Sequence, residues 1–314
     1  MFSKGIADAS NFVKGVDTAF MVILGVCFFF LISITVTMIW FVFRYRKSKN
    51  PKATQIHGSV SLEILWTAIP TAIVMVMFYF GWTGWKPMQE VPENAFNIKS
   101  VGRMWNWQFE YENGKITDTL YVPKDRAVKL DLVAMDVLHS MYIPAFRVKQ
   151  DLVPGKESFL WFVAGREGNF DLFCTEYCGM QHSYMQTSVV VMDQGKFDEW
   201  YIDTTQLATV VSDKPGAIGY SIVKRNGCLA CHSLDGSKLV GPTWKGLLGR
   251  TATVITKGKS REIIVDSDYI RKSIYEPNAD VVKGYNKGLM ISYKNELNEE
   301  DIKEILEFFK TLSE

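Results

Sequence analysis

Net charge, histidine and cysteine are all scarce in this sequence. Its 35 basic and 34 acidic residues leave a net charge of +1, which argues against nucleic-acid binding by the chain as a whole. Only four histidines and five cysteines occur among 314 residues, so any metal or redox function depends on how these few side chains cluster. Apolar residues, in contrast, make up 47% of the chain, which disfavours a soluble single-domain enzyme.

Two long uncharged runs lie near the N-terminus, at residues 18–43 and 64–85. At ~1.5 Å per residue, each can cross a hydrocarbon core of ~30 Å. A cleaved signal peptide is the alternative for the first run, but the run is too long, and Arg44 follows it where a cleavage site would need small residues. Residues 1–90 are therefore predicted to form a transmembrane helical hairpin, with Pro70 inside its second helix.

The segment between the two runs is basic and has no acidic residue before Glu63. The positive-inside rule places this loop, which also contains His57, in the cytoplasm, so both ends of the hairpin face outward. Glu63, at the inner end of the second helix, is either a snorkelling interface residue or a functional ionisable group.

The middle of the chain has the pattern of short strands. Val128, Leu130 and Leu132 alternate with residues of the opposite face, and similar short runs recur at residues 159–163, 170–173 and 188–192. This pattern predicts a β-sandwich over residues 91–205. Because Pro215 and Gly216 follow a polar stretch, residues 213–314 are predicted to form a separate domain, small and all-α. Asn298 is its expected cap for a C-terminal helix.

A short segment after a predicted strand gathers potential ligands for a soft metal. The residues are Cys174, Cys178, His182 and Met185, and His139 lies on an earlier segment. Thiolate, thioether and imidazole together favour copper, and since a single blue-copper ion needs only one cysteine, two cysteines can instead bridge two copper ions. A Cys174–Cys178 disulfide and a zinc site are the alternatives, but neither explains Met185.

The sequence Cys228-Leu-Ala-Cys231-His232 has the attachment pattern of a c-type haem, with two thioether anchors followed at once by the proximal ligand. A thioredoxin-like Cys-x-x-Cys is the alternative, but it would need a βαβ setting that this polar, helical region lacks. Residues 213–314 contain one methionine, Met290, and no histidine besides His232. Met290 is therefore the expected sixth ligand of the iron.

These features, in this order, resemble those of cytochrome c oxidase subunit II over about residues 10–205. The resemblance rests on the hairpin, the aromatic run Trp105-Asn-Trp107-Gln-Phe109-Glu-Tyr111, the sequence Asp136-Val-Leu-His139-Ser, and the segment from Cys174 to Met185. Gly241-Pro242 also resembles the cytochrome c segment whose proline carbonyl accepts a hydrogen bond from the proximal histidine. One departure is Ile291, since cytochromes c often have proline directly after the axial methionine.

The resemblance implies a cupredoxin-like domain with a dinuclear copper centre, known as CuA. Cys174 and Cys178 would bridge the two ions, with His139 and His182 as terminal ligands and Met185 and the Glu176 carbonyl as weak ligands. Glu176 would also contact a magnesium ion shared with subunit I. Trp105 would receive electrons, although packing is an alternative role, and Glu63 would lie at the mouth of a proton channel of subunit I.

The expected function is that of the subunit through which electrons enter a cytochrome c oxidase. His139, His182 and His232 are assigned and His57 lies in the loop, so no histidine remains to bind an oxygen-reducing haem within the membrane. Electrons are expected to pass from a donor to haem c, then to CuA, and then to the oxygen-reducing subunit I. The alternative is a free-standing membrane-anchored electron carrier or copper-binding protein. Two other families are disfavoured. A quinol oxidase subunit II lacks the copper ligands, which are all present here, and nitrous oxide reductase needs a large histidine-rich domain, which this sequence does not contain.

The expected location is the bacterial cytoplasmic membrane, with the metal domains on the outer side. The expected partners are subunit I, other oxidase subunits, and an electron donor such as a cytochrome c or a quinol-oxidising complex. No nucleic-acid partner is expected.

Overall fold

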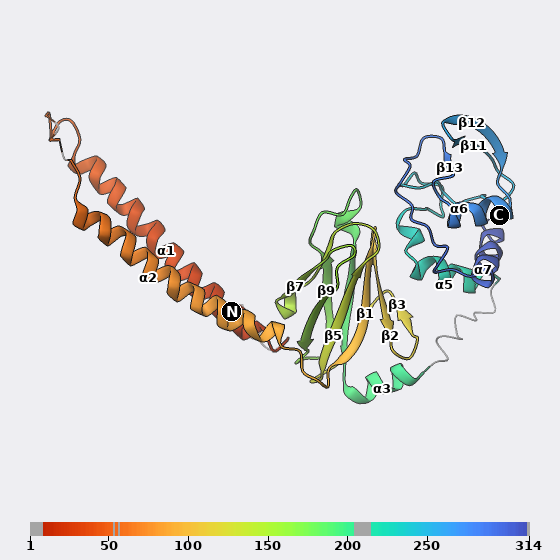
Figure 1. Cartoon of the computed structure of the whole chain (residues 1–314), viewed down its shortest axis with the longest axis horizontal. Helices are drawn as coiled ribbons and strands as arrows, with labels where there is room; N and C mark the ends of the chain where they lie inside the picture. The colour runs from red at the N-terminus through yellow and green to blue at the C-terminus, as the bar shows by residue number, and fades with distance from the viewer. Residues whose placement is uncertain (1–8, 53, 56, 204–214, 313–314) are drawn as a thin grey trace. The chain divides into compact units, whose positions relative to one another are not determined.

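The computed structural model describes residues 9–52, 54–55, 57–203 and 215–312 (Figure 1). The chain divides into two compact units, of which the first comprises Met1–Asn94 with Ala145–Arg147 and the second comprises Ala95–Pro144 with Val148–Glu314. Each unit is described by itself below.

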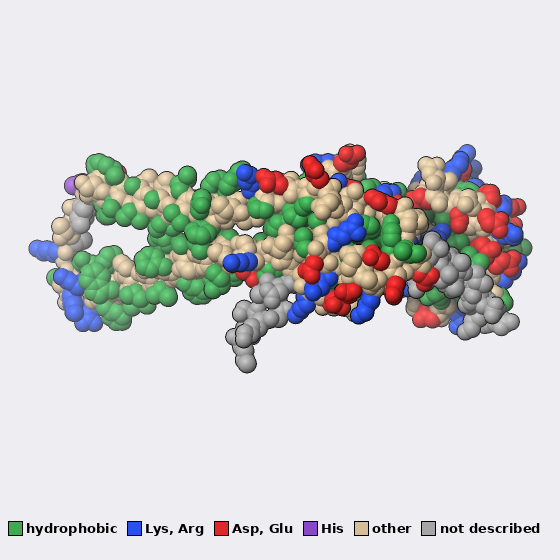
Figure 2. All heavy atoms as spheres, turned by 90° about the horizontal axis from the view of Figure 1, so that it is seen from below, with side chains coloured by type: hydrophobic (Ala, Val, Ile, Leu, Met, Phe, Trp, Pro, Cys, Tyr) green, Lys and Arg blue, Asp and Glu red, His purple; other side chains and the backbone are tan. Residues whose placement is uncertain are grey.

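The first unit consists mainly of two long apolar helices, α1 (Val13–Arg44) and α2 (Val60–Trp85), followed by the short 3₁₀ helix η1 (Lys86–Gln89). Ser59 caps α2 by accepting a hydrogen bond from the backbone N–H of Leu62. Both helices are long and apolar enough to cross a membrane, and their large apolar side chains are exposed (Figure 2). Apolar surface of this extent is unfavourable in water and suits a lipid environment.

The second unit begins with a β-sandwich of two five-stranded sheets, ordered β3-β2-β1-β5-β8 and β4-β10-β9-β6-β7. The strands are β1 (Phe96–Arg103), β2 (Asn106–Tyr111), β3 (Ile116–Thr117), β4 (Leu120–Pro123), β5 (Ala127–Ala134), β6 (His139–Ile143), β7 (Val148–Leu152), β8 (Ser158–Val163), β9 (Gly168–Cys174) and β10 (Gln186–Met192). The pairs β1–β5 and β4–β10 are parallel and the others are antiparallel.

The core of the sandwich forms from the alternation seen in the sequence. Along β5, Val128, Leu130 and Leu132 are buried between half-buried neighbours, as predicted. Phe109 and Met141, on the other hand, come from different sheets and are both fully buried. Two 3₁₀ turns, η2 (Pro144–Phe146) and η3 (His182–Tyr184), and a helix, α3 (Gln194–Ile202), complete this part of the chain.

The C-terminal part of the second unit is built on helices, as predicted. They are α5 (Ala217–Arg225), η4 (Cys228–Ala230), α6 (Ser267–Tyr275) and α7 (Glu299–Lys310). Helices α5 and α7 pack so closely that a Cβ atom on Gly219 would lie 2.0 Å from the carbonyl oxygen of Glu304, which explains the glycine. Asn298 and Asp301 form a reciprocal capping box at the start of α7.

A three-stranded sheet, which the sequence analysis did not anticipate, adds to these helices. It contains β11 (Thr251–Thr256), β12 (Lys259–Ile264) and β13 (Asp280–Val282), in the order β12-β11-β13. Lys257 and Gly258 both have positive φ angles, +49° and +82°, and join β11 to β12 in a tight hairpin.

Candidate functional site

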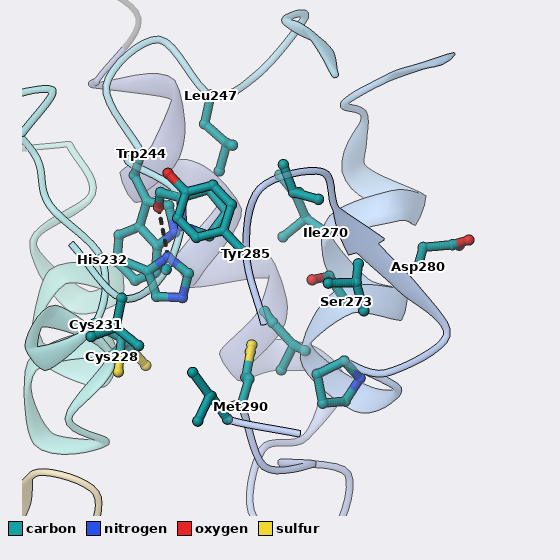
Figure 3. Close-up of a pocket in the computed structure, with 18 of the residues that line it drawn as sticks. Cys228, Cys231, His232, Trp244, Leu247, Ile270, Ser273, Asp280, Tyr285 and Met290 are labelled. Carbon is teal, nitrogen blue, oxygen red and sulfur yellow. Dashed lines mark hydrogen bonds between the residues drawn. The ribbon is translucent and has the colours of Figure 1, made fainter. Parts of the chain in front are cut away.

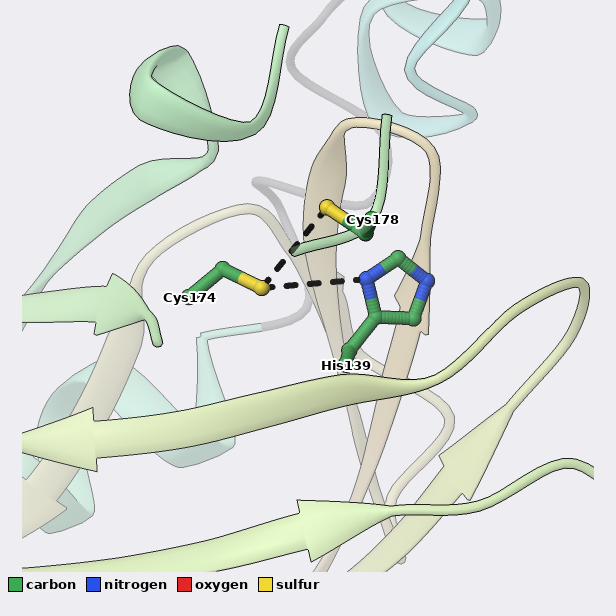
Figure 4. A group of neighbouring side chains, drawn as sticks. All are labelled: His139, Cys174 and Cys178. Carbon is green, nitrogen blue, oxygen red and sulfur yellow. Dashed lines mark hydrogen bonds between the residues drawn. The ribbon is translucent and has the colours of Figure 1, made fainter. Parts of the chain in front are cut away.

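Two buried cysteines and a buried histidine meet at one end of the sandwich (Figure 4). His139 begins β6, Cys174 ends β9, and Cys178 lies in the loop that follows. The Cys174 Sγ atom is 3.8 Å from His139 Nδ1 and 3.8 Å from Cys178 Sγ. The distance between the sulfurs far exceeds the ~2.05 Å of a disulfide, so both residues are free thiols here.

The remaining donors predicted from the sequence converge on the same place. Cys178 Sγ lies 3.5 Å from His182 Nδ1 and 3.7 Å from Met185 Sδ. The carbonyl oxygen of Glu176 is 3.3 Å from Cys174 Sγ. Because sulfur and imidazole donors are the ligands that copper prefers, this set fits copper. The hydrogen bonds from Cys178 and His139 hold the pKa of Cys174 below that of an ordinary thiol, which favours the thiolate that binds metal.

Asp136 orients the His139 ring, a role that the sequence analysis did not assign. Its Oδ1 atom lies 2.8 Å from His139 Nε2, and its carboxylate also accepts hydrogen bonds from the backbone N–H groups of Met104 and Val137. Burial alone would raise the pKa of Asp136, but these hydrogen bonds outweigh it and lower the pKa. With its proton held on Nε2, His139 presents Nδ1 toward the cysteines. The spacing Asp-x-x-His could have suggested this contact.

Trp105 touches the loop that bears the cysteines. Its side chain is buried, and its indole N–H donates a hydrogen bond of 3.1 Å to the carbonyl of Cys178. A Cβ atom on Gly179 would lie 3.1 Å from the Trp105 ring, and Gly179 has a φ of +121°. The indole therefore packs directly against the backbone between Cys178 and His182.

A second candidate site is a cavity of about 500 Å³ in the C-terminal part of the chain (Figure 3). Cys228, Cys231 and His232 line one side of it. The Nδ1 atom of His232 donates a hydrogen bond of 2.7 Å to the carbonyl of Pro242, which leaves Nε2 as the free ring nitrogen. Burial lowers the pKa of His232, which favours the neutral imidazole that ligates metal.

The His232 ring is also fixed by packing. It stacks on Trp244 with ring centroids 4.7 Å apart and planes inclined by 15°. A Cβ atom on Gly241 would lie 2.7 Å from the His232 ring, so only glycine fits at this position. These contacts hold the imidazole in one orientation at the cavity wall.

Met290 lines the same cavity from another segment, the loop between β13 and α7. In Figure 3, Met290 lies across the cavity from His232, and its sulfur points into the cavity. Apolar side chains such as Leu247 and Ile270 line much of the wall. The cavity thus offers two free thiols, an imidazole, a thioether and an apolar lining, which together fit a covalently attached haem.

Glu63 belongs to the first unit, in the first turn of α2. It lines a shallow pocket with Thr67 and Thr71, which follow it at four-residue intervals on one face of the helix. Both threonine hydroxyls donate to backbone carbonyls of the helix itself, those of Glu63 and Thr67. The ionisable group of Glu63 is what is typical of a surface that faces protein or water rather than lipid. His57 is exposed in the loop before α2.

Comparison with known proteins gives three matches to sequence models of families. The transmembrane domain of cytochrome c oxidase subunit II matches residues 5–81, its periplasmic domain matches residues 114–192, and cytochrome c matches residues 216–313. These domains imply copper in the sandwich and haem in the C-terminal domain.

Proteins similar to this chain are named as the same oxidase subunit. Cytochrome c oxidase subunit 2 of Alkalihalophilus pseudofirmus is 28% identical over 310 residues, covering 92% of this chain and 85% of the relative. The subunit 2 of Cereibacter sphaeroides is 29% identical, covering 60% of this chain and 76% of the relative. The crystal structure of the periplasmic domain of subunit II from Bradyrhizobium japonicum is 29% identical, covers 35% of this chain and 94% of that one, and has a TM-score of 0.34.

The matches cover both the membrane hairpin and the sandwich of subunit II, and the family implies assembly with subunit I and other oxidase subunits. This chain therefore belongs to the cytochrome c oxidase subunit II family, as a membrane-anchored oxidase subunit with a cytochrome c domain at its C-terminal end.

Proposed function

We propose that this chain receives electrons in its cytochrome c domain and delivers them from its sandwich domain to the oxygen-reducing subunit I. The observation that carries the proposal is the presence of two complete donor sets in one chain, at Cys174–Met185 with His139 and at Cys228–His232 with Met290. When bound, copper and haem iron supply reversible one-electron chemistry. The domain limits that we propose are residues 1–90, 91–205 and 213–314.

The copper centre that we propose is dinuclear. Cys174 and Cys178 would bridge two ions, His139 and His182 would bind at either end, and Met185 and the Glu176 carbonyl would be weak ligands. The convergence of these groups on two free thiols supports this assignment. The role of Asp136 in this proposal is to keep the His139 proton away from the metal.

In the cytochrome c domain, Cys228 and Cys231 would anchor the haem through thioether bonds. His232 would be the proximal ligand and Met290 the distal ligand, with Pro242 orienting the histidine. The position of both side chains on one apolar cavity supports this arrangement.

Three further roles complete the proposal. Trp105 would carry electrons to the copper centre, and its hydrogen bond to Cys178 supports this role. Glu176 would contribute to a magnesium site shared with subunit I. Glu63 would lie at the entrance of a proton channel in that subunit, which its exposure on α2 supports.

The proposed location is the bacterial cytoplasmic membrane, with the copper and haem domains on the outer, periplasmic side. The basic residues between α1 and α2 support this orientation, since such loops stay in the cytoplasm. The proposed electron donor is a cytochrome c or a quinol-oxidising complex.

The test is metal and haem analysis of the full chain, purified in detergent without subunit I. We expect two copper ions and one covalent haem per chain. Cys178→Ser should lose copper and keep the haem, whereas Cys231→Ser should lose one thioether bond and keep the copper. One copper ion, or zinc, per haem in the unaltered chain would contradict the dinuclear assignment.

A further inference from the structure

Asp280 is a carboxylate with only 4% of its side chain exposed, at the start of β13. Its Oδ2 atom lies 2.8 Å from Lys272 Nζ, and its Oδ1 atom lies 3.0 Å from Arg261 Nη2 and accepts a hydrogen bond from the Thr256 hydroxyl. These partners come from α6, β12 and β11 respectively. Burial would raise the pKa of Asp280, but the hydrogen bonds from Lys272, Thr256 and Arg261 lower it far below its ordinary value. We name these four residues the Asp280 cross-link.

Asp280 is one of the residues that line the haem cavity, whereas its partners Lys272, Arg261 and Thr256 do not line it. Figure 3 shows the Asp280 carboxylate directed away from the cavity that Met290 enters. Its oxygens are taken up by these three partners, and the proposed electron transfer does not use the carboxylate. Its three ties instead join strand β13 to a helix and to a hairpin.

The chain that leaves β13 reaches Met290 through an exposed loop. Gly284 and Gly288 have φ angles of +93° and +87°, and helix α7 begins only at Glu299. The N–H of Gly288 donates a hydrogen bond of 2.7 Å to Asn278 Oδ1, and the Tyr293 N–H donates one of 3.2 Å to the Ile274 carbonyl. These ties attach the loop to the end of α6 and to the residues that directly follow it.

Ile291, the residue after Met290, does not restrict the backbone of the loop as a proline would. Proline at this position would fix φ, whereas Ile291 leaves the backbone free. Packing of Met290 and Ile291 against the apolar core and hydrogen bonds to α6 and its C-terminal end therefore hold the sulfur in place. The frame formed by α6 and β13 is itself held by the charged hydrogen bonds of the Asp280 cross-link.

We propose that Asp280 is a positioning residue for Met290: its carboxylate locks β13 to α6 and to the hairpin, and so keeps the methionine loop closed over the cavity. This inference rests on the proposed role of Met290 as the sixth iron ligand. An external ligand competes with a thioether in proportion to the fraction of molecules whose loop is open. Loss of the cross-link raises that fraction.

The experiment uses the full chain with its haem attached. Asp280→Ala is compared with Asp280→Asn and with Glu276→Ala, which removes an exposed carboxylate four residues earlier. Imidazole binding to the ferric haem, the methionine-to-iron charge-transfer absorption and the haem midpoint potential are measured. We expect Asp280→Ala to raise the apparent imidazole affinity by about tenfold, because it removes several hydrogen bonds to a charged group. It should also weaken the absorption and lower the potential.

Asp280→Asn should give a smaller effect, since its amide oxygen still accepts hydrogen bonds from Thr256 and Arg261. Glu276→Ala should behave as the unaltered chain. If Asp280→Ala lowers the unfolding temperature but leaves imidazole affinity, absorption and potential unchanged, Asp280 is only structural and the inference is overturned. If Asp280→Ala does not fold, Arg261→Gln keeps the Lys272 pair and provides the same test, and an unchanged imidazole affinity overturns the inference.

Met290→Leu separates this inference from the proposed function. If Met290→Leu leaves the spectrum and imidazole affinity unchanged, the assignment of the axial ligand is wrong and the inference falls with it. If Met290→Leu changes both while Asp280→Ala changes neither, the proposed function stands and only the role of Asp280 is rejected.

Discussion

His139 and His232 are each oriented by a hydrogen bond from one ring nitrogen, but the acceptors differ. His139 donates from Nε2 to the Asp136 carboxylate, whereas His232 donates from Nδ1 to the Pro242 carbonyl. The two residues therefore present opposite ring nitrogens, Nδ1 and Nε2, to their sites. A carboxylate acceptor makes the imidazole a more basic ligand than a neutral carbonyl does. The choice of acceptor thus tunes each histidine as well as orienting it.

The carboxylate of Asp136 gives the first prediction. Asp136→Asn keeps the size of the side chain but removes the charge behind His139. We expect the copper affinity of the chain to fall by about 10- to 100-fold, the usual effect of removing such an orienting partner. Copper titration against a competing chelator measures this change. Asp171→Asn, an exposed carboxylate on β9, is the matched control, and an equal loss of affinity there would point to a general charge effect.

The two methionines that face the sites give a second, reciprocal prediction. Met290→Leu should leave the haem attached, lower its midpoint potential and open the sixth position to carbon monoxide, because a thioether ligand raises the potential. Met185→Leu should perturb the copper spectrum and spare the haem. Redox titration and absorption spectra of both variants are the measurements. An unchanged potential and no carbon monoxide binding in Met290→Leu would mean that iron takes its sixth ligand from elsewhere.

At the scale of elements, the sequence predicts best those segments whose buried and exposed residues alternate clearly. The strand pattern at residues 159–163 corresponds to β8, and the runs at 170–173 and 188–192 lie within β9 and β10. Because these strands bury one face in the sandwich core, their apolar residues recur with a period of two. Helix α7 also buries one face, and its apolar residues recur at helical spacing, which made it predictable as well.

The hairpin of β11 and β12 was missed because it lacks that alternation. Nearly all of its residues are exposed or half-buried, with Val254 as the buried exception in β11. The hairpin is held by the antiparallel pairing of β11 with β12 and by the turn at Lys257 and Gly258. Arg261 and Thr256 also bind it to Asp280. The cluster of copper donors was visible in the sequence as residue types. The spacing of Asp136 and His139 is compatible with their pairing, but the pairing itself depends on how the chain turns into β6.

The capping box of α7 gives the third prediction. Asn298→Ala removes the side chain that accepts a hydrogen bond from the Asp301 N–H, so we expect the cytochrome c domain to lose about 1 kcal/mol of unfolding free energy. Urea unfolding of the full chain, followed by haem absorption, measures the change. Asn295→Ala is the control, since Asn295 is exposed and precedes the helix. A loss of equal size in both variants would show that the cap is not the cause.

At the scale of the whole molecule, one chain combines a membrane anchor with two donor sets. Donor sets that belong to one chain, separated in sequence by only residues 204–214, stay at a high effective concentration with respect to each other. A separate cytochrome reaches comparable concentrations only when it is abundant. The fusion therefore removes one diffusional encounter from the proposed electron path.

This gives the last prediction, that electrons move from the haem domain to the copper domain within a single chain. Because the two domains are tethered, the rate should stay constant when the protein is diluted tenfold and should depend little on added salt. Flash reduction of the haem in the detergent-purified full chain, followed at the haem and copper absorption bands, measures this rate. Cys178→Ser, which should lack copper, is the control that shows haem reduction without onward transfer. A rate that grows in proportion to protein concentration would mean that transfer occurs between chains, and the tether would then have to serve some purpose other than electron delivery.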